Sequence, residues 1–131
     1  MKDLLCSEFQ DTVERCLVRH RSVLDVMTKL QESNARINRA IAKSITSCGC
    51  LTISAARQRV PEDVSLQELR DHMDTHLAGK LCENCLEAVE VELGNHLFYV
   101  AGLCNLLSLN LYDVLLKERQ RLSALGIFKF C

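Results

Sequence analysis

The chain has 131 residues, of which 48% are hydrophobic and 25% are charged, values typical of one folded domain with its own core. Its net charge is -1 and only 5% of its residues are aromatic, so it lacks the basic surface and the stacking side chains of a nucleic-acid-binding protein. The amino-terminal segment has no apolar signal region, and no apolar run approaches the roughly 20 residues of a membrane span. We therefore expect one cytoplasmic domain over residues 1–131 that binds neither nucleic acid nor membrane.

Helical periodicity dominates the first third of the chain. Apolar residues recur at helical spacing over residues 3–21 and again over Val23–Thr46, and Ser22 between them has the character of a helix cap. Asn34 and Asn38 interrupt the second apolar stripe. One proline and five glycines in the whole chain leave few interruptions, so the predicted fold class is all-α, a helical bundle.

An extended loop is predicted at Ser47–Pro61, with residues 51–53 as a short extended piece inside it. Ser65 and Glu68 then form a capping signature for a helix that we expect to run to about Leu77 and to stop near Gly79. The periodicity further predicts a long helix, a last helix and an apolar tail, at Leu81–Leu107, Leu111–Leu122 and Leu125–Phe128.

Two cysteine pairs are the strongest chemical signal. Cys48 and Cys50 are one residue apart, and Cys82 and Cys85 are two residues apart, in a chain of eight cysteines without a secretion signal. Four thiolates match the tetrahedral shell of structural Zn²⁺, so we expect a zinc site that pins the loop, with His76 as an alternative ligand. A disulfide or a redox-active pair is one alternative, because a thiol at a helix start has a lowered pKa, and four unrelated buried thiols are another.

The long helix from Leu81 has a predicted core stripe and two chemically different polar sides. The stripe consists of Leu86, Val89, Leu93, Leu97, Val100, Cys104 and Leu107. At 100° per residue one face carries both thiols of the second pair together with a carboxylate and an imidazole, within about 80°: Cys82, Cys85, Val89, Glu92 and His96. Another side carries three carboxylates, which we interpret as a solvated face: Glu83, Glu87 and Glu90.

The stretch from Glu87 to Glu118 resembles the third core helix of MazG-type nucleotide pyrophosphohydrolases. The helix of that family has the pattern E-x-x-E-L-G-D, then an apolar run with small residues and a short turn into the next helix. In this chain Glu92 matches the second glutamate of the pattern, and Asn95 stands at the position of the aspartate.

The resemblance implies a MazG-like helical fold and a homo-oligomer with sites near its subunit interfaces. It also implies Mg²⁺ ions, held by four acidic residues on two antiparallel helices, that assist hydrolysis between the α- and β-phosphates of a nucleoside triphosphate. Asn95 brings no negative charge, however, and the E-E-x-x-E motif of the partner helix is missing. Glu92 and Asn95 are thus the candidate catalytic residues of a site in which catalysis is expected to be weak or absent.

The expected function is nucleotide binding, related to triphosphate pyrophosphohydrolysis, with degenerate catalysis and a structural zinc ion. A non-enzymatic, zinc-stabilised oligomerisation or regulatory module and a thiol redox sensor are the alternatives. We expect a dimer or a tetramer, because the stripe Val23–Ile45 and the tail Leu125–Phe130 offer more apolar surface than a small monomer covers. Asn34 or Asn38 would set the register of a two-fold interface.

Overall fold

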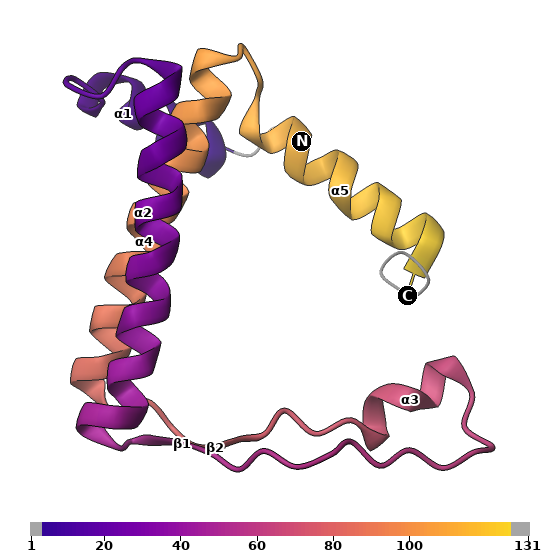
Figure 1. The fold of residues 1–131 in the computed structure, drawn as a ribbon. Helices are drawn as coiled ribbons and strands as arrows, with labels where there is room; N and C mark the ends of the chain where they lie inside the picture. Colours follow the sequence, from indigo (N-terminus) through magenta and orange to yellow (C-terminus); the bar gives the residue numbers. More distant parts are fainter. Residues whose placement is uncertain (1–3, 127–131) are drawn as a thin grey trace.

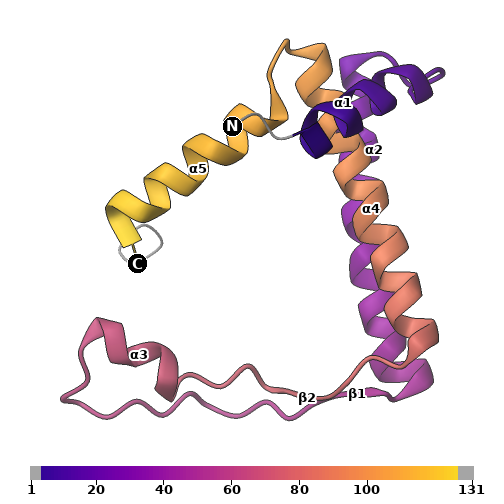
Figure 2. The same cartoon turned by 180° about the vertical axis from the view of Figure 1, so that it is seen from behind.

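Two long antiparallel helices form the centre of the computed structural model, which describes residues 4–126. Helix α2 (Val23–Lys43) lies beside helix α4 (Glu83–Leu106) along most of its length (Figures 1 and 2). Val26 and Ile37 of α2 and Val89 of α4 are buried there. The buried members of the apolar stripe predicted for α2 are therefore covered within the chain, whereas Asn34 and Asn38 are exposed.

Helix α1 (Leu4–Cys16) closes the other part of the core, against the carboxyl-terminal half of α4. The contact is close because Gly102 of α4 has no side chain. A Cβ atom at that position would lie 3.2 Å from Cδ2 of Leu17. The buried apolar residues at this end of the molecule come from both segments: Val13, Leu17, Ala101 and Cys104.

Helix α5 (Leu111–Leu125) leaves the end of α4 at a bend of 104°. Gln10 of α1 fixes the bend, because its side-chain amide donates to the carbonyl of Leu109 (2.7 Å) and its amide oxygen accepts from the backbone N–H of Leu111 (2.9 Å). Beyond this bend α5 extends away from the central helices, and none of its residues is buried.

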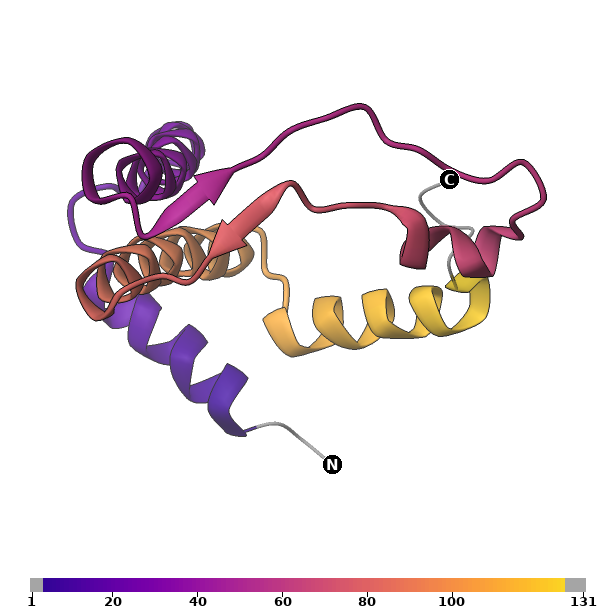
Figure 3. The ribbon, with the colours of Figure 1, turned by 90° about the horizontal axis from the view of Figure 1, so that it is seen from below.

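A long arm, residues 51–79, projects from the opposite end of the central pair. Strands β1 (Leu51–Ile53) and β2 (Leu77–Gly79) pair antiparallel at its base, and helix α3 (Leu66–His72) lies near its tip (Figures 1 and 3). Two hydrogen bonds between Gln58 and the backbone of Asp74, at 2.7 and 2.9 Å, hold its two sides together.

The predicted third helix is too long at its carboxyl end. It stops at His72, because Met73 is extended (ψ 129°) and His76 has a positive φ of 59°. Leu77 then pairs with Ile53 in the sheet instead of continuing the helix. The fold is otherwise mostly helical, as predicted, and the apolar tail from Leu125 lies largely outside the described residues.

Membrane-spanning character is absent from every individual helix in the described part of the chain. Only α4 and α5 taken together reach the required length and apolar composition, and the bend of 104° separates them.

Candidate metal centre and the adjoining cleft

The first cysteine pair is positioned by an irregular end of α2. A π-helical turn, η1 (Ser44–Cys48), continues α2, and Gly49 closes it in the left-handed conformation (φ 80°), with its N–H donating to the carbonyl of Ser44 (2.9 Å). Glycine suits this position because it has no Cβ to clash. The chain reverses there, and the Cys50 thiol reaches back to the same carbonyl of Ser44 (3.7 Å).

The second pair lies on the first turn of α4. Cys82 is the N-cap of the helix, and its sulfur accepts the backbone N–H of Cys85 at 3.5 Å. Because β2 ends at Gly79, directly before this turn, and β1 begins at Leu51, directly after Cys50, the strand pairing brings the two cysteine pairs together.

The four sulfur atoms converge as the spacing predicted. The Sγ atoms of Cys48, Cys50, Cys82 and Cys85 all lie within 4.8 Å of one another, and Cys48 and Cys82 are 3.8 Å apart. A tetrahedral zinc site with Zn–S distances of about 2.3 Å places its sulfurs about 3.8 Å apart, whereas a disulfide needs about 2.05 Å. The cluster therefore has the dimensions of a metal site, and none of its four cysteines forms a disulfide.

His76 is not a member of this cluster. The group of converging metal-ligand atoms found in residues 4–126 consists of the four cysteines alone. His76 precedes β2 on the side of Leu77, while the sulfurs lie beyond Gly79 at the other end of that strand.

The surroundings of Cys82 favour ionisation of its thiol. The backbone N–H of Cys85, followed by the Cys85 thiol, lowers the pKa of Cys82 to about 7. A thiolate is the form that binds metal ions and also the form that attacks disulfides. A divalent cation among four thiols would complete their ionisation, because metal ligation requires deprotonated sulfur.

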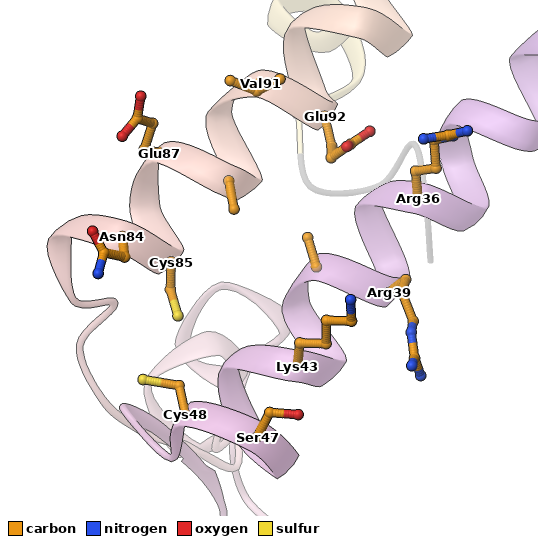
Figure 4. Close-up of a pocket in the computed structure, with 12 residues that line it drawn as sticks. Arg36, Arg39, Lys43, Ser47, Cys48, Asn84, Cys85, Glu87, Val91 and Glu92 are labelled. Carbon is orange, nitrogen blue, oxygen red and sulfur yellow. The ribbon is translucent and has the colours of Figure 1, made fainter.

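A cleft of about 710 Å³ adjoins the cysteines between α2 and α4. Its α2 wall carries three basic side chains, and its α4 wall carries two acids, with the sulfurs of Cys48 and Cys85 at one end (Figure 4). The charged residues of the two walls are Arg36, Arg39, Lys43, Glu87 and Glu92.

Glu92 is the most unusual residue of the cleft. Its Oε2 atom is buried and has no hydrogen-bond partner among the described residues. Glu92 points from α4 toward α2 (Figure 4), where Arg36 lines the same cleft, but Arg36 forms its ion pair with Glu32, at 3.0 Å. An unpartnered carboxylate oxygen beside basic residues is a site at which a bound molecule would supply the missing contact.

Asn95, the second candidate catalytic residue, lies apart from this cleft. It lines a smaller cavity of about 170 Å³ together with Glu32 and Lys29. Lys29 and then Arg36 hold the pKa of Glu32 below its ordinary value, so that carboxylate is ionised and already paired with cations. Within residues 4–126 no group of three or more acids converges as the Mg²⁺ chemistry of the resembled family would require.

One contact between α2 and α4 could not be predicted from the sequence. The hydroxyl of Ser33, which is buried, and Nδ1 of His96 share a hydrogen bond of 2.8 Å across α2 and α4. The helical wheel placed His96 on the face of the cysteines, and that face does lie toward α2. Only the pairing of the two helices reveals that a serine stands opposite the imidazole.

Comparisons of the chain with protein-family models, with curated proteins and with solved structures found no match.

Proposed function

We propose that the protein is a non-enzymatic, zinc-stabilised helical module. The observation that supports it is the convergence of four sulfurs from the end of α2 and the start of α4 within 4.8 Å of one another. An ion bound there would join the two central helices to the base of the arm. Structural zinc sites with four cysteine ligands contribute directly to folding energy and leave no open position for catalysis.

Metal analysis of protein purified without added metal tests this function. We expect about one zinc ion per chain, retained through dialysis and removed by a strong chelator with release of reactive thiols. Metal-free protein that reversibly forms a disulfide between Cys48 and Cys82 would instead support a redox sensor. Metal-free protein with four unreacted thiols would contradict both functions.

Nucleotide binding in the cleft is the second candidate, favoured by the wall of three basic side chains on α2. Arginine and lysine bind phosphate oxygens through charge-assisted hydrogen bonds. The cleft also has apolar residues, Ala40, Ala88 and Val91, against which a base could lie. Because the cleft has only two carboxylates, Glu87 and Glu92, and no group of three or more acids converges in residues 4–126, binding without hydrolysis is the behaviour that we propose.

For this second candidate we expect pyrophosphate release to stay at background over a panel of nucleoside triphosphates with Mg²⁺ or Mn²⁺. Lys43→Ala should weaken triphosphate binding, measured by calorimetry, while Arg70→Ala on α3 is the control of equal charge change. Glu92→Gln should strengthen binding without Mg²⁺, because it removes a negative charge from the cleft. Rapid turnover that Glu92→Gln abolishes would show instead that the protein is an active hydrolase.

A further inference from the structure

The chain exposes far more surface than a compact protein of its mass. Its accessible surface is 10189 Å², whereas a folded monomer of 14.8 kDa exposes about 7,000 Å². Residues 1–3 and 127–131 cannot account for this difference, since even a fully unfolded segment of that size exposes only about 1,300 Å². The remaining excess exceeds the roughly 800 Å² that each partner contributes to a stable interface.

Part of this surface is an apolar row on α4. Leu86, Leu93 and Leu97 lie within about 40° of one another on the helix, between the face of the buried Val89 and the acidic side. They are exposed by 43%, 44% and 54%, so about half of each residue is left uncovered by the described part of the chain. We call these three residues the α4 row.

A second apolar row runs along α5. Val114, Leu115, Leu122 and Leu125 occupy a stripe about 100° wide, and all four are exposed. We call these residues the α5 row. Both rows extend over 11 residue steps, which is about 16 Å of helix, so one row matches the other in length.

The charges beside the two rows are complementary. On α4 the acidic side adjoins the row, and α4 contains no lysine or arginine: Glu83, Glu87 and Glu90. On α5 Lys117 and Arg121 stand one turn apart beside the row, while Glu118 lies within the stripe and pairs with Arg121 at 3.3 Å. The helix as a whole carries three basic and two acidic residues, so it is basic where α4 is acidic. Opposite charges that flank an apolar seam determine which helices associate and in which orientation.

The two rows of one chain cannot cover each other, because α5 leaves α4 at 104° and extends outward (Figures 1 and 3). We infer that the occupant of these surfaces is a second copy of this chain, with the α5 row of each copy packed on the α4 row of the other around a two-fold axis. Each copy then covers both rows, and the acidic side of α4 faces the basic side of α5. The interface identifies the partner of the module proposed above and rests on that proposal.

Sedimentation velocity of the full chain, loaded with zinc, tests the assembly at micromolar concentration. We expect twice the mass of the single chain, and a mass of 14.8 kDa at every concentration would overturn the inference. Replacing Leu93 and Leu97 by Gln, or Leu115 and Leu122 by Gln, should raise the dissociation constant at least about tenfold. The matched control replaces Leu24 and Met27 of α2, which are also exposed (68% and 52%) but lie outside both rows.

Reversal of charge tests which row meets which. Glu87→Lys with Glu90→Lys should weaken the dimer, as should Lys117→Glu with Arg121→Glu, and the combination of all four changes should restore it. Failure of the combination to restore association would overturn the packing of α5 on α4. Zinc content and circular dichroism of each variant separate this result from the proposed metal site, since a folded, zinc-loaded monomer would contradict only the interface.

Discussion

Cys82→Ser is expected to abolish stable zinc binding and to lower the free energy of unfolding by several kcal/mol. The substitution isolates the metal ligand, because serine is itself a preferred N-cap and can accept the same backbone N–H of Cys85. Apparent binding energies of structural zinc are about 10–16 kcal/mol in small zinc-binding peptides, comparable to the whole stability of a domain. Loss of one of four ligands should therefore destabilise the end of α2, the start of α4 and the paired strands together.

Urea unfolding followed by circular dichroism measures this change, and hydrogen exchange of β1 and β2 locates it. Cys16→Ser is the matched control, because Cys16 is an exposed, free thiol on α1, outside the cluster. It should leave zinc content and stability unchanged. If Cys82→Ser and Cys16→Ser unfold at the same urea concentration, the four cysteines do not hold a stabilising ion.

Gly79→Ala is the second change with a large expected effect, although residue 79 carries no chemistry. Gly79 has a φ of 85° and pairs with Leu51, and a Cβ atom there would lie 2.3 Å from the carbonyl oxygen of Cys50. The left-handed conformation alone costs alanine about 1–2 kcal/mol, and displacing the backbone of Cys50 adds roughly 1–3 kcal/mol. Since Cys50 is a ligand in the proposed site, zinc affinity should fall with stability.

Gly49→Ala separates the two costs of Gly79→Ala. Gly49 has nearly the same φ, 80°, but no atom lies within 4 Å of a Cβ built on it. The Gly49→Ala variant should therefore lose only the part of the stability that comes from backbone conformation. It should bind zinc more tightly than the Gly79→Ala variant in competition with a chelator. Equal losses of zinc affinity in the two variants would mean that the contact between residue 79 and the carbonyl of Cys50 does not affect the position of the first cysteine pair.

The convergence of the four cysteines was predictable because its signal is local. Each pair is close in sequence and lies at a helix end, which restricts the positions that its two sulfur atoms can take. The sulfurs of Cys48, Cys50, Cys82 and Cys85 do converge. The core stripe predicted for α4 is buried at Val89 and Cys104, and Glu83, Glu87 and Glu90 are exposed as expected. The prediction was wrong for the leucines of the stripe, because Leu86, Leu93, Leu97 and Leu107 are exposed. Periodicity determines which side of a helix is apolar, and that information is contained in one segment.

What could not be predicted depends on contacts between distant segments. Leu77–Gly79 is too short for a strand period to appear, and it is extended only because Leu51–Ile53 lies beside it. In the same way, no pattern in α4 indicates that Glu92 faces a wall with Arg36 and Lys43, because the side of α2 that meets α4 is decided by packing. The MazG-type pattern would have acidic residues on the helix that faces Glu92, whereas α2 presents basic residues to the cleft.

The hydrogen bond between Ser33 and His96 has a consequence for the order of folding events. A slip of α2 along α4 by one helical turn moves the helices by about 5.4 Å and breaks this hydrogen bond. His96 then loses its partner on α2, while Ser33 keeps its bond to the carbonyl of Leu30 (2.9 Å). The same slip exceeds the 4.8 Å within which all four sulfurs lie, so it would also separate the two cysteine pairs. One serine and one histidine, three or more turns away from the cysteines, thus align the ligands before any ion arrives. An ion in the proposed site would then meet ligands already held close together, because the entropy of bringing them together is lost in the pairing of the helices.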